Sequence, residues 1–381
     1  MTQPQRPDKC HLAAYYFPNY HRDPRNDQWH GSGWTEWELA KVARPRFEGH
    51  QQPKVPLWGY EDESDPAVFA KKIQAAADHG VDTFLFDWYW YEDGPYINGG
   101  LEKGFLKAEN NHRMTFALMW ANHDWVDIHP LKYRTPQRVL IPGCVSNEAF
   151  ERLTDWIIEK YFSHPCYWKI DGKPYFSVYE LDKLIEGLGG LEKTCQALKR
   201  FDEKARKIGL AGIHFNAVVW KIPILPGEKT AADANGLLDT LGFSSVTSYV
   251  WVHHDWPSGF PTASYSEMAS RAPQKWQDIA SEYKLPYYPN VTMGWDSSPR
   301  ACQSDVYENL GYPFGFILEG NTPEIFRYAL LSAREYLLRK PASERILTIN
   351  AWNEWTEGSY LEPDTIHQMG YLQAIRDVFG E

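Results

Sequence analysis

The sequence predicts an α/β protein, a (β/α)8 (TIM) barrel with a long loop insertion after the first strand. Eight short runs rich in β-branched and aromatic residues recur along the 381-residue chain, and amphipathic helical stretches lie between them. The length also fits one large α/β barrel. A doubly wound open sheet is the alternative, because it has the same alternation of strands and helices.

The predicted strands are short runs that favour extended structure, and most lead into a loop of mixed aromatic and polar residues. In chain order they are HLAAYYF (11–17), VDTFLFDW (81–88), RMTFALMW (113–120), KPYFSVY (173–179), GIHFNAVVW (212–220), FSSVTSY (243–249), YYPNVTM (287–293) and RILTINAW (345–352).

Five amphipathic stretches between the strands are predicted as helices. The first has a recognisable start, because Asp65 can cap a helix N-terminus and Pro66 fits the first turn. It ends at Gly80, a residue type that is common just past the last helical turn. The other predicted helices are 147–162, 190–209, 273–284 and 322–340.

The segment 18–64 is the longest stretch outside these elements, and it follows the first strand. A loop of this length is usually functional or disordered. Its four tryptophans argue against disorder; they are Trp29, Trp34, Trp37 and Trp58. No repeat, low-complexity tract or flexible linker divides the chain. We therefore expect a single (β/α)8 catalytic domain over residues 1–381, with 18–64 as its extended first βα loop.

The charge of the chain argues against two classes of partner. The formal net charge is −11 at pH 7, whereas nucleic acid and anionic membranes bind basic patches. No apolar run is long enough to span a membrane, and the N-terminus MTQPQRPDKC lacks the apolar stretch of a signal peptide. We expect a cytoplasmic location, although a chain trimmed of its leader would look the same. The oligomeric state stays open.

No motif for a metal or a cofactor is present, and we expect neither. The five cysteines are widely spaced and include no CxxC pair, so neither a structural zinc site nor a disulfide framework is indicated. HHD at 253–255 lacks the HExxH spacing of a zinc protease. The chain also lacks GxGxxG, GxxxxGK[ST] and GxSxG, the motifs of dinucleotide, P-loop and acyl-transfer sites.

Aromatic residues make up 15% of the chain, and their positions indicate a ligand. Many follow apolar runs, as in DWYWY (87–91), MWANHDW (119–125) and YVWVHHDW (249–256). Trp and Tyr present an apolar face with a polar edge, which suits a molecule with C–H faces and hydroxyl edges. The pattern therefore points to a carbohydrate partner, an oligo- or polysaccharide substrate.

In a (β/α)8 barrel, functional side chains lie at the carboxyl ends of the strands and in the loops that follow. Carboxylates, indoles, Asn, His and Arg gather at these positions, although core packing is the alternative for any single Trp. The residues predicted to bind substrate are Tyr16, Trp34, Glu36, Asp87, Trp88, Trp90, Trp120, Asn122, His123, Tyr179, Trp220, Tyr249, Trp251, Asp296, Arg300, Trp352 and Asn353.

Glu354 and Glu357 are the predicted catalytic pair, in the stretch ILTINAWNEWTEGSY. Glycoside hydrolysis needs two carboxyl groups in different protonation states beside the bond that is cleaved. On a continuous strand an offset of three would point the two side chains to opposite faces. The chain must therefore turn at or just after Trp355, and Gly358 favours such a turn.

Three other arrangements stay open for these carboxylates. The pair can lie in a solvated loop with one surface ion pair. Alternatively, Glu354 is a helix cap or network residue and only Glu357 is catalytic. In the third arrangement, which many barrel glycosidases use, Glu180 after the fourth strand is the acid and Asp296 after the seventh is the nucleophile.

Six sequence blocks are spread over nearly the whole chain: AYYFPNYH (14–21), GSGWTEWE (31–38), FDWYWY (86–91), MWANHDW (119–125), GWDSSPR (294–300) and NAWNEWTEGSYLEPD (350–364). Together they resemble the glycoside hydrolase family 99-like proteins, which include bacterial proteins described as WbsX-type glycosyltransferases. In the fourth block, His123 and Asp124 depart from the WANENW form expected of the family.

The resemblance implies a (β/α)8 barrel and a retaining, α-mannosidase-like chemistry. In the characterised endo-α-1,2-mannosidases, two Glu lie three residues apart. The first is a base on the sugar's own 2-hydroxyl, which produces a 1,2-anhydro intermediate, and the second is the general acid and then the base. Carried over, Glu354 takes the first role and Glu357 the second. This route requires a 2-hydroxyl trans to the leaving group, as in an α-mannoside.

The favoured function is accordingly a retaining glycoside hydrolase, endo-α-mannosidase-like (EC 3.2.1.-), that cleaves α-linked, mannose-like residues of an oligo- or polysaccharide. One alternative is a polysaccharide-biosynthesis glycosyltransferase of the WbsX type, although no DxD or phosphate-binding loop is evident. The other is a non-catalytic glycan-binding protein that keeps the aromatic platform without turnover.

Overall fold

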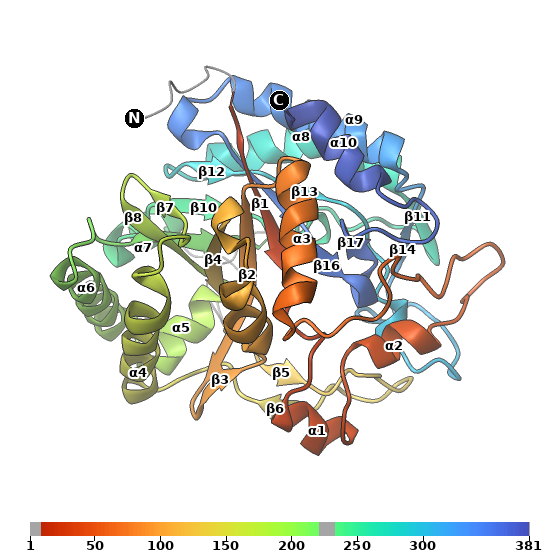
Figure 1. The fold of residues 1–381 in the computed structure, drawn as a ribbon, viewed down its shortest axis with the longest axis horizontal. Helices are drawn as coiled ribbons and strands as arrows, with labels where there is room; N and C mark the ends of the chain where they lie inside the picture. Colours follow the sequence, from red (N-terminus) through yellow and green to blue (C-terminus); the bar gives the residue numbers. More distant parts are fainter. Residues whose placement is uncertain (1–8, 221–232, 381) are drawn as a thin grey trace.

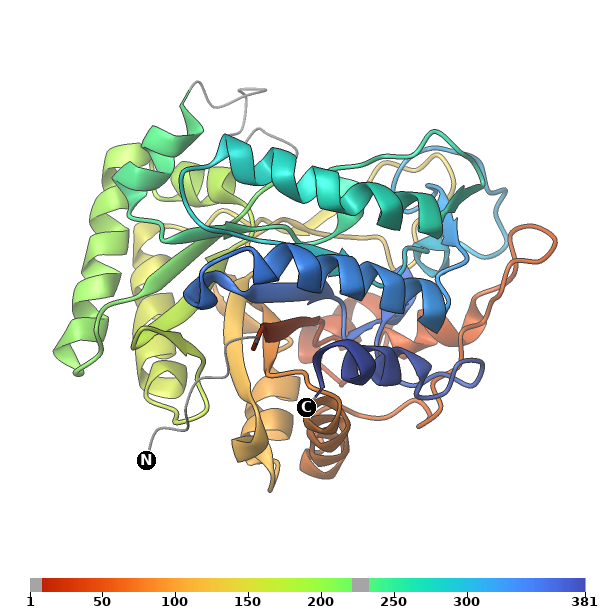
Figure 2. The same ribbon diagram turned by 90° about the horizontal axis from the view of Figure 1, so that it is seen from above.

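A parallel β-sheet closes into a barrel at the centre of the molecule, with helices around it (Figures 1 and 2). The structure is a computed structural model that describes residues 9–220 and 233–380. Neighbouring strands pair in the order β12-β10-β9-β8-β4-β2-β1-β15-β13. Their bounds are β1 (His11–Tyr16), β2 (Thr83–Tyr91), β4 (Thr115–Trp120), β8 (Lys173–Val178), β9 (His214–Val218), β10 (Ser245–Thr247), β12 (Tyr287–Tyr288), β13 (Asn290–Thr292) and β15 (Ile346–Asn350).

The two ends of this order belong to one stretch of chain. β12 pairs in parallel with β10, and β13 pairs in parallel with β15. Only Pro289 separates the two strands, and a proline has no N–H to donate to a neighbouring strand. The segment 287–292 thus serves as the seventh strand of an eight-stranded barrel. The predicted barrel is confirmed, and the doubly wound open sheet is excluded.

All five predicted helices are present, and one of them starts earlier than predicted. They are α3 (Pro66–Asp78), α4 (Asn147–Ile157) with a π-helical extension over Ile158–Phe162, α6 (Leu191–Lys207), α8 (Tyr265–Glu282) and α9 (Pro323–Leu338). The predicted start of α8 at 273 is wrong. Ser264 caps this helix by accepting a hydrogen bond from the N–H of Glu267, and Pro273 lies inside the helix.

Shorter helices and strands lie between these elements. The additional α-helices are α1 (Pro24–His30), α2 (Trp37–Val42), α5 (Leu181–Gly187), α7 (Ala234–Leu241) and α10 (Gly370–Phe379). The additional strands are β3 (Gly94–Tyr96), β5 (Trp125–Val126), β6 (Val139–Ile141), β7 (Lys169–Ile170), β11 (Thr262–Ser264), β14 (Ile317–Glu319), β16 (Asn353–Glu354) and β17 (Ser359–Tyr360).

The insertion 18–64 carries α1 and α2 and packs against segments that are distant in sequence. The indole N–H of Trp37 donates to the carbonyl of Glu61 at 2.8 Å, within the insertion. Glu36 and His50 instead reach residues that follow β13, as described below. The insertion is therefore ordered, as its tryptophans predict.

Alternation along β2 divides its side chains between the barrel interior and the surrounding helical layer. Phe84 and Phe86 point outward and pack against Phe105. Asp87 and Tyr89 point inward and line a cavity. Because successive strand residues face opposite sides, only every second residue of a barrel strand can reach the interior.

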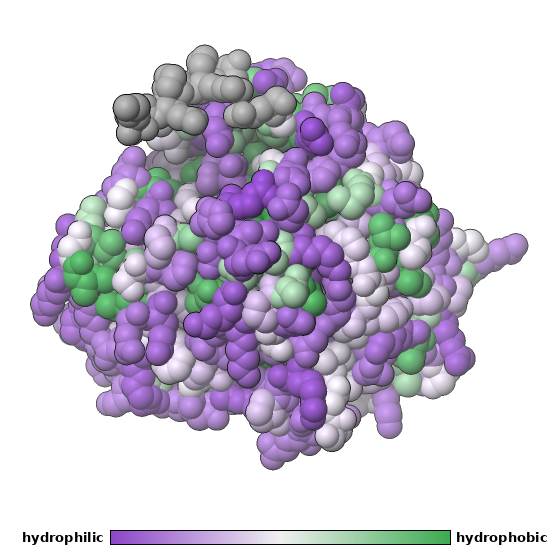
Figure 3. All heavy atoms as spheres, viewed as in Figure 1, coloured by the Kyte–Doolittle hydropathy of each residue, from purple (hydrophilic) through white to green (hydrophobic). Residues whose placement is uncertain are grey.

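The surface view shows a mainly hydrophilic face with small, separate apolar patches (Figure 3). Over residues 9–220 and 233–380, no helix combines the length and the apolar character that crossing a bilayer requires.

Candidate active site

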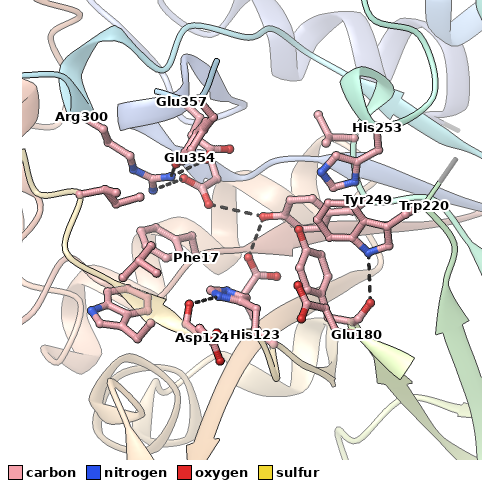
Figure 4. Close-up of a pocket in the computed structure, with 18 of the residues that line it drawn as sticks. Phe17, His123, Asp124, Glu180, Trp220, Tyr249, His253, Arg300, Glu354 and Glu357 are labelled. Carbon is pink, nitrogen blue, oxygen red and sulfur yellow. Dashed lines mark hydrogen bonds and ion pairs between the residues drawn. The ribbon is translucent and has the colours of Figure 1, made fainter. Parts of the chain in front are cut away.

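A cavity of about 540 Å³ opens at the carboxyl ends of the barrel strands. Its wall includes Glu354 and Glu357 on one side and Trp220, His253 and Glu180 on the other (Figure 4). The two glutamates follow β15, and the opposite wall is formed by residues that follow β8, β9 and β10.

The turn that carries Glu354 and Glu357 meets the geometric condition predicted for the pair. β16 ends at Glu354, a single 3-10 turn spans Trp355–Glu357, and β17 returns antiparallel. Gly358 ends the turn in the left-handed region, at φ 64°. A Cβ at this position would lie 2.6 Å from the Cβ of Asp296, so glycine is required for conformation and for space. Both carboxylates consequently line the same cavity.

Arg300 lies between the two carboxylates and joins them to a third. Its Nη2 is 3.1 Å from Oε2 of Glu354, and its Nη1 forms an ion pair with Oε1 of Glu357. Its Nε donates to Oε1 of Glu36 at 2.9 Å. The hydroxyl of Tyr312 donates to the same Glu357 oxygen at 2.9 Å. The pair is thus buried and networked, which contradicts the solvated-loop arrangement.

Burial dominates the electrostatics of the pair. Burial raises the pKa of Glu354 well above its ordinary value, and the adjacent charge of Glu357 raises it further while Arg300 lowers it. Burial also raises the pKa of Glu357, although Arg300 and the Tyr312 hydrogen bond act in the opposite direction. Two coupled carboxyls with raised pKa values favour a state in which a proton is held within the site.

Tyr249 connects Glu354 to a further buried carboxyl. Its hydroxyl lies 2.8 Å from Oδ2 of Asp87 and 3.4 Å from Oε1 of Glu354. Burial raises the pKa of Asp87 well above its ordinary value, since the Tyr249 hydrogen bond and the charge of Arg300 offset the loss of solvation only in part.

The opposite wall combines stacked rings with another carboxyl. The rings of Trp220 and His253 stack with centroids 3.7 Å apart. Burial raises the pKa of Glu180 to about 7, and the charge of Asp182 adds to this effect while Lys183 opposes it. This wall therefore offers a flat aromatic surface beside a titratable side chain.

The structure brings eight of the predicted site residues together on the cavity wall. They are Asp87, His123, Tyr179, Trp220, Tyr249, Arg300, Glu354 and Glu357. The other predicted residues do not line it; these are Tyr16, Trp34, Glu36, Trp88, Trp90, Trp120, Asn122, Trp251, Asp296, Trp352 and Asn353.

Strand alternation places three of the tryptophans on the outside of the barrel. Trp88 and Trp90 stack on each other, and Trp90 packs against Trp156 of α4. Trp120 packs against Phe150, also of α4. The sequence prediction includes consecutive residues at the strand ends, whereas the period of two admits only one of each neighbouring pair to the interior.

Trp251 and Asn122 support the barrel from behind the cavity. Trp251 donates its indole N–H to the carbonyl of Asn290 at 2.8 Å and stacks on Tyr265. The amide of Asn122 donates to the carbonyl of Glu180 at 2.7 Å and accepts from the Glu180 N–H at 2.8 Å. Asn122 thereby fixes the backbone next to a cavity residue.

A polar network behind the Trp355–Glu357 turn holds the predicted residues Trp352 and Asn353. Glu362 accepts hydrogen bonds from the indoles of Trp352 at 2.9 Å and of Trp355 at 2.7 Å. Asn353 donates to Oε1 of Glu63 at 2.7 Å. The predicted residue Tyr16 donates to the same Glu63 oxygen at 2.7 Å. These residues hold the turn in place and do not reach the cavity.

Asp296, the nucleophile of the third arrangement, faces away from the cavity toward the insertion. Its Oδ2 lies 2.9 Å from Nε2 of His50 and accepts a hydrogen bond from Gln52 at 2.7 Å. Despite its burial, the hydrogen bond with His50 and the charge of Lys54 hold the pKa of Asp296 well below its ordinary value. An arrangement that pairs Glu180 with Asp296 therefore lacks its second carboxyl in the cavity.

The predicted residues Glu36 and Trp34 lie behind cavity-lining side chains. Burial alone would raise the pKa of Glu36, but Arg300 and other neighbours hold it below its ordinary value. The ring of Trp34 packs 5.9 Å from that of His129, which does line the cavity.

Sequence reasoning misses several wall residues, among them Phe17, Tyr89, His129, Trp256 and Tyr312. Tyr89 follows Asp87 at the strand period, so a period-two rule finds it. Tyr312 contacts Glu357 from the loop between β13 and β14, outside the GWDSSPR block (294–300) of that loop.

Comparisons with known proteins identify the family of this chain. The family described as Glycosyltransferase WbsX matches residues 12–375. Proteins named "Uncharacterized protein WxcX", from two strains of Xanthomonas campestris pv. campestris, are 27% identical over 370 residues, which is 96% of this chain and 49% of each relative. The chain thus spans about half the length of the curated relatives it matches.

Solved structures with the same architecture share little sequence with this chain. The GH99 endo-alpha-mannosidase from Bacteroides thetaiotaomicron, in complex with BIS-TRIS-propane, aligns with a TM-score of 0.57 at 14% identity, over 96% of this chain and 94% of that one. A "Glycoside hydrolase-like protein" aligns with a TM-score of 0.61 at 13% identity, over 98% and 95%. These likenesses show the fold. Because the family match covers nearly the whole chain, this protein belongs to the WbsX glycosyltransferase family.

Proposed function

We propose that this protein is a glycan-active enzyme, a retaining glycosidase that cleaves α-linked, mannose-like residues of an oligo- or polysaccharide. The observation that carries the proposal is the buried pair Glu354 and Glu357, which face one cavity from a single turn with Arg300 between them. Two carboxyls on one cavity wall are the groups that glycoside cleavage requires.

Glu357 is the proposed general acid. Burial raises its pKa and so favours the protonated form, which a general acid needs. It would protonate the leaving oxygen while the bond from that oxygen to the anomeric carbon breaks. In the second step it would accept a proton from the attacking water. The Tyr312 hydroxyl orients its carboxyl group.

Glu354 is the proposed base on the sugar's 2-hydroxyl. This proton transfer lets O2 bond to the anomeric carbon and form a 1,2-anhydro sugar. Water then opens this ring with net retention, and Glu354 returns its proton to O2 as the bond from O2 to the anomeric carbon breaks. A base must be ionised, and Arg300 favours the ionised form of Glu354. Burial and the charge of Glu357 favour the protonated form instead. The role of Glu354 as a base therefore depends on further groups that keep it ionised.

The comparisons and the cavity wall support a carbohydrate substrate. A solved relative in fold is an endo-alpha-mannosidase by name. The aromatic rings of Trp220, Tyr179 and Tyr249 line the cavity beside carboxylates, a combination suited to the C–H faces and hydroxyl edges of sugars.

Glutamine substitution tests the assignment. With a panel of α-mannans as substrates, Glu354→Gln and Glu357→Gln should each lower the release of reducing sugar by about 10²-fold or more, the usual contribution of an acid or base. Glu203→Gln, on the exposed surface of α6, is the control that keeps full activity. Full activity in either cavity variant would refute the roles proposed for the pair.

The family description favours a second candidate, a glycosyltransferase. A transferase would bind a nucleotide sugar, so GDP-mannose or a UDP-sugar with Mn²⁺ should raise the melting temperature. A clear shift, together with sugar transfer and no hydrolysis, would favour this candidate. Glycan binding without turnover of any kind would instead indicate a binding protein.

A further inference from the structure

Asp87, Tyr249 and Glu354 form a hydrogen-bonded chain. The number of protons in this chain limits which of the two carboxyl groups can be ionised. The Tyr249 oxygen lies within hydrogen-bond distance of a carboxyl oxygen on each side, yet its hydroxyl supplies one proton. The second hydrogen bond therefore needs a proton from a carboxyl group. When both contacts are hydrogen bonds, either Asp87 or Glu354 is neutral.

The surroundings of the two carboxyls decide which one carries the charge. The second oxygen of Glu354, Oε2, lies 3.1 Å from Nη2 of Arg300, which stabilises a negative charge there. The second oxygen of Asp87, Oδ1, is buried and has no hydrogen-bond partner among the described residues. An ionised Asp87 would therefore have one hydrogen bond and no cation in contact with it.

We propose that Asp87 is held neutral and donates its proton to Tyr249, so that the Tyr249 hydroxyl points its own proton at Glu354 and keeps that carboxylate ionised. The inference rests on the proposed function, in which Glu354 is the base. Asp87 and Tyr249 are then positioning residues that act through Glu354. Together, Asp87 and Tyr249 keep Glu354 from taking up a proton.

The proton balance of this arrangement is simple. In the alternative state Glu354 is neutral and donates to Tyr249, which donates to Asp87. Passing to the proposed state moves one proton from Glu354 to the tyrosine oxygen and another from that oxygen to Asp87. Two O–H bonds break, two form, and the net charge stays at −1.

Several other titratable groups face Asp87 and set its surroundings. Glu357 repels a charge on Asp87 and Arg300 attracts one. The remaining groups are buried phenols: Tyr89 on the same strand as Asp87, Tyr15 on the neighbouring β1, and Tyr179 just after β8. Burial in this mostly neutral shell also raises the pKa of Asp87, and a carboxyl kept neutral in this way can donate a hydrogen bond at neutral pH.

The first test needs no substrate. Infrared spectra of protein labelled with ¹³C at the aspartate carboxyls should show a protonated aspartate C=O stretch at pH 7. The band should vanish in Asp87→Asn and persist in Asp296→Asn, because Asp296 is ionised by its contacts with His50 and Lys54. Spectra in which every aspartate is ionised at pH 7 would overturn the proposal.

The second test measures α-mannan turnover against pH. Tyr249→Phe removes the hydrogen bond donated to Glu354, so kcat should fall by about tenfold or more, with KM changed far less. The acid limb of the pH profile should move to higher pH, because Glu354 becomes harder to ionise. Tyr265→Phe, which removes a buried hydroxyl outside the cavity, should leave the acid limb in place.

The conservative variant separates this role from a structural one. The amide introduced by Asp87→Asn has the shape of a neutral carboxyl and can donate to Tyr249. This variant should therefore keep most of the activity that Tyr249→Phe loses and leave the acid limb in place. An Asp87→Asn variant as impaired as Tyr249→Phe would refute the neutral-donor role. If the Glu354→Gln and Glu357→Gln variants are inactive but the infrared spectra contain no protonated aspartate band, the role of Asp87 is rejected and the glycosidase assignment stands.

Discussion

Glu180 is a cavity carboxyl that stands apart from the Glu354 and Glu357 pair. Its backbone is fixed by the reciprocal hydrogen bonds with Asn122. Burial raises its pKa from 4.5 to about 7, and Asp182 contributes in the same direction. The side chain therefore changes charge near neutral pH, on the wall opposite the proposed catalytic pair.

This raised pKa predicts a pH-dependent stability. A carboxyl whose pKa is higher in the folded state stabilises the fold fully below the unfolded pKa of 4.5, and this contribution is lost as pH rises through about 7. The contribution amounts to roughly 3 kcal/mol. Relative to Glu180→Gln, the wild type should lose about that much stability between pH 4.5 and 8, measured by urea unfolding. Glu203→Gln should differ from wild type by a constant amount. A constant difference for Glu180→Gln too would show that Glu180 has an ordinary pKa.

At the scale of elements, a buried cation on α3 supports the turn that carries Glu354 and Glu357. Lys72 is 2% exposed and pairs with Oε1 of Glu63 at 2.9 Å and with Oε1 of Glu362 at 2.7 Å. Glu362 in turn holds the indoles of Trp352 and Trp355. One lysine thus pairs with two buried carboxylates, and their hydrogen bonds hold the side chains of Trp352, Asn353 and Trp355 beside Glu354.

Removing this lysine should be costly. Lys72→Met leaves two buried carboxylates without their cation, so the free energy of unfolding should fall by about 3–5 kcal/mol. Lys71→Met, next to it in the same helix, removes a partly exposed pair with Glu61 and should cost about 1 kcal/mol or less. Chemical denaturation of both variants makes the comparison. Equal, small losses would mean that the Lys72 network contributes little to stability.

The sequence predicts the barrel well because its elements repeat a strong pattern. Each of the eight predicted strands overlaps an observed one, and the helix starts at Asp65 and Thr322 follow cap chemistry. The predicted start of α8 is wrong because Pro273, typical of a first helical turn, lies within the helix, and the true cap is Ser264. Periodicity and helix caps depend only on residues that are close in the sequence, so the fold can be predicted from them.

A residue of the site can be predicted only where its position depends on neighbouring residues in the sequence. The turn between Glu354 and Glu357 follows from their spacing and from Gly358. The role of Lys72 is hidden, because a lysine on an amphipathic helix usually faces solvent. Tyr312 reaches Glu357 through the tertiary path of a long loop, which no local periodicity encodes.

At the scale of the whole molecule, segments distant in sequence form the mouth of the cavity. Val126 and Gln137 come from the region of β5 and β6, Trp256 follows β10, and Tyr312 precedes β14. Gln137 donates to the carbonyl of Tyr312 at 3.1 Å and joins two of these segments. The barrel therefore fixes the proposed catalytic pair, while its loops set the shape of the entrance.

Trp256 is the most exposed large aromatic ring of this entrance. It is 47% exposed and packs edge-on against Phe316, with ring centroids 4.8 Å apart. An indole held on one side and open on another can stack on a sugar ring. If the proposed function holds, this ring contacts a sugar unit beyond the one at Glu354.

Trp256→Ala should therefore affect long substrates selectively. Losing one stacking contact of roughly 1 kcal/mol should raise KM for an α-mannan oligosaccharide about fivefold. kcat/KM for a 4-nitrophenyl α-mannoside, too short to reach the mouth, should stay the same. Tyr328→Ala, an exposed aromatic of α9 outside the cavity, controls for the loss of a surface ring. Equal effects on both substrates would contradict a sugar-binding role at the mouth and would mean that Trp256 shapes the whole cavity. A subsite at the mouth contributes only when the oligosaccharide is long enough to occupy it.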